Sequence, residues 1–328
     1  MPEPTPTSSG SNLGVLEAPP SGPEDVRAGL LAHDYLAEEG LATSVYLAVV
    51  LRRPLLLEGE AGVGKTELAK ALSRWTGAEL LRLQCYEGID ASQAVYEWDY
   101  SRQLLHLRAV ESLRTPARPD RETGPAPDLQ AVEDELYSER FLVRRPLLAA
   151  IAPVGGGPPP VLLIDEVDRA DDEFEAFLLE ILSDFAVTVP ELGTFRAEVP
   201  PLVVLTSNRT RDVHDALKRR CLYHWIEHPD FDHEVRIVTM RAPAVAESLA
   251  RQVAGAVERL RAMGLYKPPG VAETIDWAEA LAALGRRGLD ERTVELTLGS
   301  VLKYREDAER VRGAGLGDLV RAAVQRAG

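Results

Sequence analysis

Hydrophobic positions in the N-terminal part of the chain alternate between short apolar runs and stripes with helical spacing. The apolar runs predict strands, and residues 161–164 have the unbroken pattern of a parallel strand that is buried on both faces. Residues 41–49, 65–75 and 174–185 carry the stripes of amphipathic helices. The expected strands lie at residues 55–58, 80–85, 161–164, 202–206 and 222–226. This alternation predicts an α/β domain with a parallel sheet.

The pattern changes after Pro229, where most segments have the spacing of an amphipathic helix. Helices are expected at residues 244–262, 271–284, 290–310 and 316–326. We therefore divide the folded chain into an α/β domain at residues 24–240 and a small all-α domain at residues 241–328. Residues 1–23 are rich in proline and serine, and we expect a disordered tail there.

Two segments of the α/β domain stand apart from its alternating pattern. Four prolines between Thr115 and Pro127, followed by an acidic run, predict that residues 113–135 form a solvated insertion without regular secondary structure. Residues 186–190 and 195–199 have the residue types of paired strands. Because a glycine lies between them, they predict a short hairpin.

The chain is strongly acidic, with 52 acidic and 37 basic residues and a net charge of −15. This excess opposes phosphate backbones, so we expect no nucleic-acid partner. No apolar run approaches the roughly 18 residues that span a bilayer, so we expect no membrane insertion. The polar N-terminus differs from a signal peptide, and two cysteines cannot make a disulfide framework. A cytoplasmic location is the expectation.

A glycine-rich segment, GEAGVGKT, lies between the first expected strand and the helix that begins at Lys65. Its glycines let the backbone curl so that successive N–H groups point at phosphates. Lys65 is expected to reach the β- and γ-phosphates, and Thr66 to bind Mg²⁺. The nucleotide-binding residues predicted from this segment are Gly59, Glu60, Ala61, Gly62, Val63, Gly64, Lys65 and Thr66.

Polar side chains follow two of the buried strands, at the sheet edge where ligands of open α/β sheets bind. Asp165 is placed to hold Mg²⁺ through water, and Glu166 to polarise the water that attacks the γ-phosphate. Asn208 follows the next strand. It either aligns the same water or simply turns the chain.

A basic run, Lys218-Arg219-Arg220, precedes the last expected strand. It is either a helix end whose cations complement the helix dipole or an arginine finger that neutralises charge on the γ-phosphate. The order of the motifs along the chain favours the finger, with Arg220 as first choice and Arg219 as second.

These motifs, in this order, resemble an AAA+ ATPase over about residues 24–300. GEAGVGKT resembles its Walker A motif, VLLIDE its Walker B motif, Asn208 its sensor 1 and Arg219-Arg220 its finger. The string DEVDRA and the hairpin before sensor 1 are similar to the MoxR family. Other strings are closer to the CoxD branch, which is linked to maturation of carbon-monoxide dehydrogenase. They are LQCYEGID (83–90), VYEWDYSRQLL (95–105), VPELGTFRA (189–197), SNRTRDVHDALKRRCLYHWI (207–226) and PGVAETIDWA (269–278).

The resemblance implies a three-layer α/β/α P-loop domain with a parallel sheet, followed by a small all-α lid domain. It implies that the protein hydrolyses ATP with Mg²⁺ and forms a homo-oligomeric, hexameric ring. The implied partners are a von Willebrand factor A domain protein and a metalloenzyme client, such as a molybdenum-copper carbon-monoxide dehydrogenase. Many relatives carry a sensor 2 arginine where this chain has residues 270–275, which contain none. Arg286, Arg287 and Arg292 are alternatives.

Two other functions remain open. A nucleic-acid motor of the same superfamily would need a basic pore, whereas residues 87–100 hold four carboxylates and no lysine or arginine. A scaffold that binds ATP without hydrolysis would lack a water-polarising carboxylate, and Glu166 is present. Tyr96, Trp98 and Tyr100 are either surface anchors for a client or ordinary hairpin packing. The client and the preference for ATP over GTP also stay open.

Overall fold

The computed structural model describes residues 19–114, 129–155 and 157–328. Residues 1–18 of the expected tail and residues 115–128 of the expected insertion lie outside these ranges. Within the described ranges, no helix is long and apolar enough to cross a membrane.

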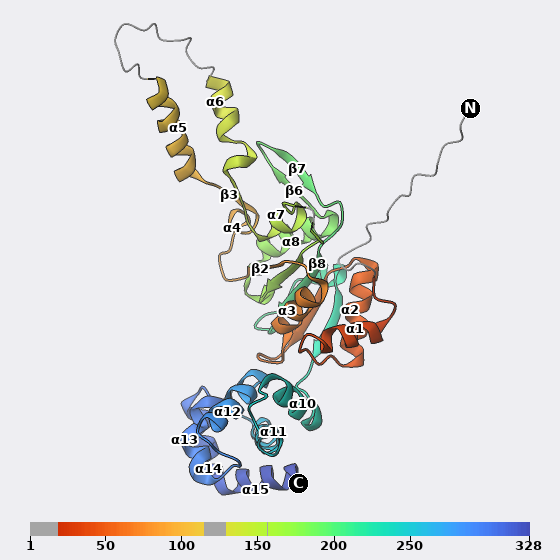
Figure 1. Ribbon diagram of the computed structural model, residues 1–328, viewed down its shortest axis with the longest axis vertical. Coiled ribbons are helices and arrows are strands. Elements are labelled where there is room, and N and C mark those ends of the chain that lie inside the picture. Colours follow the sequence, from red (N-terminus) through yellow and green to blue (C-terminus); the bar gives the residue numbers. More distant parts are fainter. Residues whose placement is uncertain (1–18, 115–128, 156) are drawn as a thin grey trace, which may run out of the picture.

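A parallel sheet of five strands occupies the centre of the N-terminal part (Figure 1). Its spatial order is β2-β5-β8-β1-β9, and every neighbouring pair is parallel. The strands are β1 (Leu55–Gly59), β2 (Leu80–Gln84), β5 (Val161–Asp165), β8 (Leu202–Ser207) and β9 (Leu222–Ile226). The predicted parallel sheet is therefore confirmed, and each strand lies within one or two residues of its expected place.

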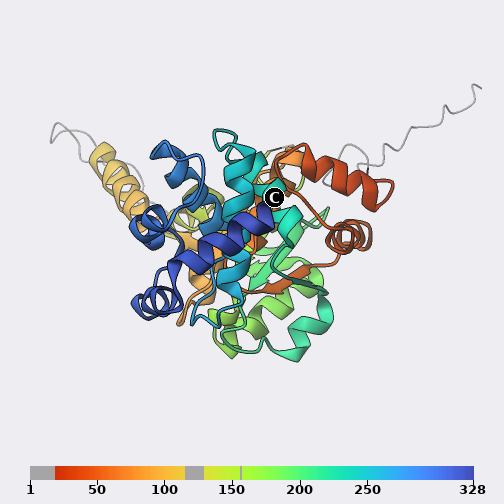
Figure 2. The same ribbon diagram turned by 90° about the horizontal axis from the view of Figure 1, so that it is seen from below.

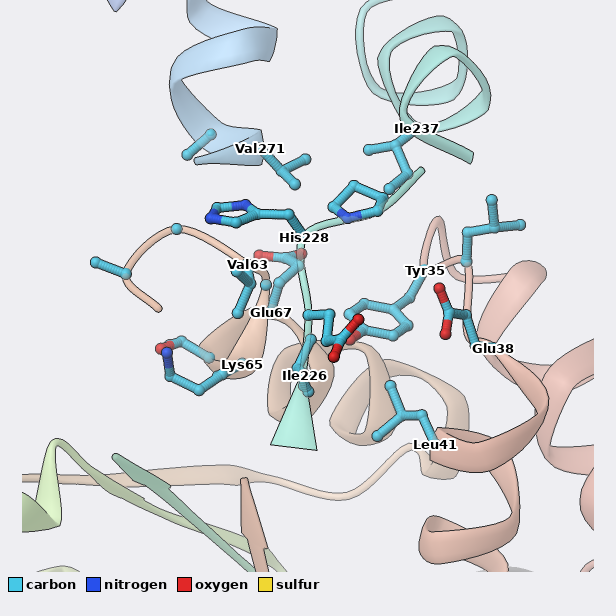
Figure 3. Close-up of a pocket in the computed structure, with 18 of the residues that line it drawn as sticks. Tyr35, Glu38, Leu41, Val63, Lys65, Glu67, Ile226, His228, Ile237 and Val271 are labelled. Atoms are coloured by element: carbon cyan, nitrogen blue, oxygen red, sulfur yellow. The ribbon is translucent and has the colours of Figure 1, made fainter. Parts of the chain in front are cut away.

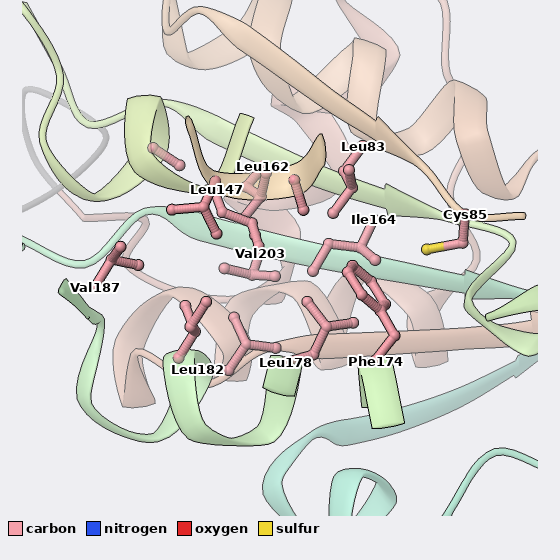
Figure 4. Close-up of a cluster of buried hydrophobic side chains, with 14 of the residues drawn as sticks. Leu83, Cys85, Leu147, Leu162, Ile164, Phe174, Leu178, Leu182, Val187 and Val203 are labelled. Carbon is pink, nitrogen blue, oxygen red and sulfur yellow. The ribbon is translucent and has the colours of Figure 1, made fainter. Parts of the chain in front are cut away.

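Helices cover both faces of this sheet. One face packs on α1 (Pro23–Leu31), α2 (Glu39–Leu51) and α3 (Lys65–Thr76), and the other on α7 (Pro146–Ile151), α8 (Asp172–Asp184) and α9 (Asp215–Arg220). Because successive strand residues point to opposite faces, Leu163 of β5 joins the first core and Ile164 the second. Figure 4 shows Phe174 and Leu178 of α8 packed in the second core. The predicted three-layer α/β/α arrangement is confirmed.

A helical arm projects from the sheet domain (Figure 1). It consists of α5 (Tyr100–Arg114) and α6 (Leu129–Leu136). At its base, α4 (Ala91–Val95) leads into β3 (Tyr96–Trp98), which pairs antiparallel with β4 (Leu142–Arg144) after a 3₁₀ turn at Glu139–Phe141. The expectation that residues 113–135 lack secondary structure is thus wrong where α6 lies. A contact with α5 holds α6, because the Gln103 amide donates to the Leu136 carbonyl at 2.6 Å.

The three aromatic residues at the base of the arm differ in exposure. Trp98 is buried, and its ring meets that of Tyr137 edge to face at 5.2 Å. Tyr96 is half-buried against Trp98, whereas Tyr100 is 67% exposed. Trp98 therefore belongs to the packing of the arm, and Tyr100 is the most exposed of the three.

The predicted hairpin is present but shifted. It consists of β6 (Ala186–Val189) and β7 (Gly193–Arg196), which are antiparallel. The second strand begins two residues before the expected 195–199, because Gly193 adopts a φ of +91° in the turn and pairs with Val189.

The C-terminal part of the protein is helical and lies below the sheet domain in Figure 1. Figure 2 shows it from below, with α15 crossing in front. Its helices are α10 (Phe231–Arg241), α11 (Glu247–Arg261), α12 (Val271–Ala283), α13 (Glu291–Val301), α14 (Arg305–Ala314) and α15 (Leu316–Ala327). The predicted helical lid is confirmed. Because Val238 of α10 packs in the core of this group, we propose that the helical domain begins at Phe231 rather than at residue 241.

The expected single helix at residues 290–310 is wrong, because the structure breaks it into α13 and α14. Leu302 is extended, with φ −113° and ψ 132°, and it is buried in the core of the helical domain. The following Tyr304 meets Tyr266 edge to face at 5.1 Å, and Asp307 accepts the N–H groups of Tyr266 and Lys267. These tertiary contacts end the helix although its apolar period continues.

A buried ion pair ties α11 to α10. Arg261 donates two hydrogen bonds to Glu234, at 2.7 and 2.8 Å, and the Glu234 side chain is 1% exposed.

We expect Arg261→Met to lower the free energy of unfolding by about 3–5 kcal/mol, because it leaves a buried carboxylate without its cation. Arg305→Met, which removes an exposed pair with Glu309, should cost at most about 1 kcal/mol. Circular dichroism during urea unfolding would compare them, and equal losses would contradict the expectation.

Candidate functional site

The glycine-rich loop joins the end of β1 to the start of α3. Gly62 and Gly64 have φ values of +81° and +96°, a region that favours glycine. A Cβ atom at Gly62 would also lie 3.0 Å from the Cα atom of Gly270. The Val271 N–H, at the start of α12, donates to the Gly62 carbonyl at 2.9 Å. The loop conformation therefore needs glycine, and the loop is held directly against the helical domain.

Lys65 is the first residue of α3 and is only 6% exposed. Its Nζ atom donates to the carbonyl oxygens of Gly59 and Glu60, at 2.8 and 2.6 Å. Burial lowers the pKa of Lys65 to about 8, and the carboxylates of Asp168 and Asp165 act in the opposite direction. The lysine is thus folded back onto its own loop, within reach of the cavity that the loop borders.

Asp165 ends β5 and is buried among hydrogen-bond donors. Its Oδ1 atom accepts the hydroxyls of Thr206, at 2.6 Å, and Thr66, at 3.1 Å. Its Oδ2 atom accepts a hydrogen bond from the Nε atom of Arg82 at 3.0 Å. A hydroxyl and a carboxylate are oxygen ligands of the kind that Mg²⁺ takes, so the Thr66–Asp165 pair fits a magnesium ion on a bound nucleotide.

Glu166 lies beside Asp165 in a left-handed conformation, with a φ of +55°. Its Oε1 atom accepts the Asn208 amide at 3.3 Å. Its Oε2 atom accepts the Gln84 amide at 3.1 Å and pairs with Arg169 at 2.9 Å. The structure thus brings the two residues expected to handle water together at one edge of the sheet.

Sequence patterns missed three side chains that contact these carboxylates. Arg82 and Gln84 lie on β2, and Thr206 lies on β8. The register places Gln84 opposite Asp165, so the end of β2 reaches the same sheet edge. Polar residues at alternating positions 82 and 84 of an otherwise apolar strand were the available clue.

A cavity of about 890 Å³ adjoins the loop and these carboxylates. Figure 3 shows Tyr35 and Leu41 on one side of it and Ile237 and Val271, from the helical domain, on the other. Burial raises the pKa of Tyr35. Apolar walls next to a glycine-rich, phosphate-binding type of loop can hold the base of a nucleotide.

Trp225 of β9 also lines this cavity. Its indole ring is half-buried and lies under the guanidinium of Arg209, with the Cζ atom 5.7 Å from the ring centroid. Arg209 directly follows Asn208 and has a φ of +56°. An aromatic side chain is therefore part of the wall beside Asn208.

The arginines expected near a phosphate are not at this cavity. Arg219 and Arg220 are exposed at the end of α9, where the Arg53 guanidinium donates to their carbonyl oxygens at 2.9 and 3.2 Å. Neither belongs to the described residues that line the cavity, and nor do the sensor 2 alternatives. Those alternatives are Arg286, Arg287 and Arg292.

Arg241, at the end of α10, lines the cavity from the side of the helical domain. Its Nη1 atom donates to Glu67 of α3 at 2.9 Å. Sequence patterns did not single it out, because it lies outside the expected lid stretch at residues 270–275.

Comparison with known proteins places this site in a family. Residues 54–221 match the model of the AAA domain, dynein-related subfamily. Among solved structures, the RuvB Holliday junction branch migration motor of Thermotoga maritima is 16% identical, with a TM-score of 0.42 over 84% of this chain and 68% of that chain. A point mutant of that RuvB is 14% identical, with a TM-score of 0.43 over 84% and 69%. No curated protein matches the chain.

Proposed function

The chain belongs to the AAA domain family, in its dynein-related subfamily, and from this we propose that it binds ATP with Mg²⁺ in the cavity and hydrolyses it to ADP and phosphate. The convergence of three groups at one sheet edge carries the proposal. They are Lys65 on the glycine-rich loop, the Thr66–Asp165 pair and the Glu166–Asn208 pair. Phosphoryl transfer depends mostly on positioning and charge stabilisation, which these groups can supply.

The loop and its lysine would hold the phosphates. Lys65 exchanges the carbonyl oxygens of Gly59 and Glu60 for β- and γ-phosphate oxygens, and loop N–H groups donate to the same phosphates. Thr66 would hold the metal directly and Asp165 would hold it through water. When bound, Mg²⁺ neutralises charge on the phosphate oxygens.

Glu166 and Asn208 would handle the attacking water. The carboxylate accepts a hydrogen bond from the water and polarises it, while the amide donor beside it fixes its orientation. Gln84 and Arg169 hold the other carboxylate oxygen, so the acceptor has a defined direction.

Arg220, with Arg219 as second choice, would complete the site of a neighbouring copy. Both are exposed at the end of α9 and lie outside the cavity of their own chain. A finger that acts in trans requires an assembly of identical subunits, which the family resemblance makes a hexameric ring. Arg241 is the corresponding candidate for contact with the nucleotide from the lid of the same chain.

Mixing two inactive chains tests this assignment. Arg220→Ala should lower the ATPase rate by about 10³–10⁵-fold, and Lys65→Ala should remove it. Mixed assemblies should regain turnover wherever an intact loop meets an intact finger. Arg305→Ala, which changes an exposed arginine of α14, is the control and should leave the rate unchanged. If assemblies shown to contain both chains regain no turnover, a finger at Arg220 in trans is wrong, and the same test then applies to Arg219.

We further propose that hydrolysis drives the remodelling of a protein client, in the manner of MoxR proteins of the CoxD branch. The strings that resemble this branch support the proposal, together with an arm that carries the exposed Tyr100. A von Willebrand factor A domain protein and a metalloenzyme such as a carbon-monoxide dehydrogenase are the proposed partners. The net charge of −15 favours protein partners over nucleic acid.

A further inference from the structure

Arg82 binds the carboxylate that we assign to magnesium. Its Nε atom donates to Oδ2 of Asp165 at 3.0 Å, and its Nη2 atom donates to the same oxygen and, at 2.6 Å, to Gln84. The Asp165 side chain is 4% exposed, whereas that of Arg82 is 52% exposed. A buried carboxylate is thus paired with a guanidinium that is half exposed to solvent.

The other partners of Asp165 carry no charge. Its Oδ1 atom accepts two threonine hydroxyls, from Thr66 and Thr206. Hydroxyls satisfy hydrogen bonds but do not neutralise a carboxylate, and an unpaired buried charge is strongly unfavourable. Among the side chains that contact Asp165 in the described structure, Arg82 supplies the positive charge.

A guanidinium and a divalent cation that use one carboxylate repel each other, because two positive charges a few ångströms apart interact strongly in a partly buried site. We propose that Arg82 is a positioning residue that sets the magnesium affinity of the site. It neutralises Asp165 in the metal-free protein and weakens the binding of magnesium-bound nucleotide, which promotes product release. This inference rests on the proposed function, in which Asp165 faces Mg²⁺.

The exposure of Arg82 suits this role. A guanidinium that is already half exposed can move from Asp165 into solvent with little rearrangement of its surroundings. β2 is also an edge strand of the sheet in the described part of the chain, and such a position leaves one flank of the strand unpaired.

The experiment measures ADP affinity by titration calorimetry, with Mg²⁺ and with a chelator, for the full chain. Arg82→Gln keeps a hydrogen-bond donor but loses the charge. In this variant the ADP affinity with Mg²⁺, divided by the ADP affinity with chelator, should be about tenfold higher than in wild type. Arg82→Lys keeps the charge but not the contact through two nitrogens, so its ratio should lie between those of Arg82→Gln and wild type. Arg102→Gln, in an exposed arginine that donates to a backbone carbonyl of the arm, is the matched control and should not change the ratio.

The outcomes separate this inference from the proposed function. A wild-type ratio in Arg82→Gln, with wild-type ADP affinity still dependent on Mg²⁺, would overturn the role of Arg82 alone. If the ADP affinity of the wild-type protein does not depend on Mg²⁺, both the role of Arg82 and the proposed function are overturned. Thermal unfolding of the metal-free variants adds a second readout, since Arg82→Gln should be less stable than wild type without Mg²⁺ and should regain more of that stability with Mg²⁺ and ADP. A stability loss that ligand leaves unchanged would mark a purely structural residue and overturn the inference.

Discussion

Lys65→Ala is expected to abolish nucleotide binding, with a loss of affinity of about 10²-fold or more, because each charge-assisted hydrogen bond to a phosphate contributes about 1.5–3 kcal/mol. The lysine is buried beside the loop, where its ammonium donates to a loop carbonyl. Titration calorimetry with ATP and Mg²⁺ would measure the loss.

Lys303→Ala provides the matched control. The Lys303 ammonium also donates to backbone carbonyls, those of Gly299 and Ser300, but it is exposed at the end of α13 and far along the chain from the loop. Its loss should leave ATP affinity unchanged. Tight binding by the Lys65 variant would show that the phosphates lie elsewhere.

Glu166→Gln is expected to keep ATP binding and to lower the hydrolysis rate by about 10²–10⁴-fold, because the amide cannot take up charge or a proton from the attacking water. The Gln side chain keeps the size of glutamate and one oxygen that can accept a hydrogen bond from the Asn208 or the Gln84 amide, so the fold should survive. Single-turnover assays with bound ATP would separate chemistry from binding. Glu173→Gln, in an exposed residue of α8, is the control. Full activity in the Glu166 variant would remove its assigned role.

The same variant tests the client hypothesis, since it should hold the ATP state. A ligand shifts a conformational equilibrium only if it binds the two states with different affinity. A von Willebrand factor A domain partner should therefore be recovered better by Glu166→Gln with ATP than by wild type with ADP. Equal recovery in both states, or recovery of nucleic acid instead, would contradict a protein-remodelling function.

The sheet and the glycine-rich loop could be predicted because their determinants are local. Residues 161–164 are apolar at every position, which is the pattern of a strand covered on both faces. Gly62 and Gly64 occupy positive φ values that the motif itself requires. Helix α6 and the break between α13 and α14 escaped prediction because tertiary contacts decide them. Leu302 continues the apolar period of α13, and only the packing of Tyr304 on Tyr266 shows why the helix stops.

The candidate site likewise contains residues that the sequence predicts and residues that it does not. Lys65, Asp165 and Asn208 lie at the sheet edge where the order of strands and motifs placed them, whereas Arg219 and Arg220 lie away from the cavity. Arg82 and Gln84 belong to no motif, and their polar side chains on β2 are equally typical of a solvated edge strand. The register that pairs Gln84 with Asp165 is what brings them to the carboxylates, and strand register over such a distance in sequence is a tertiary property.

The position of Trp225 gives the protein an intrinsic optical reporter. Its indole ring lines the cavity beneath the Arg209 guanidinium, so a bound nucleotide changes the charge and polarity around the fluorophore. Trp277, in contrast, is fully buried in the helical domain with its Nε1 atom donating to Thr297 at 2.8 Å, and its emission reports the integrity of that core. In variants that keep only Trp225 or only Trp277 of the four tryptophans, occupancy of the cavity and folding of the helical domain can therefore be followed separately by fluorescence.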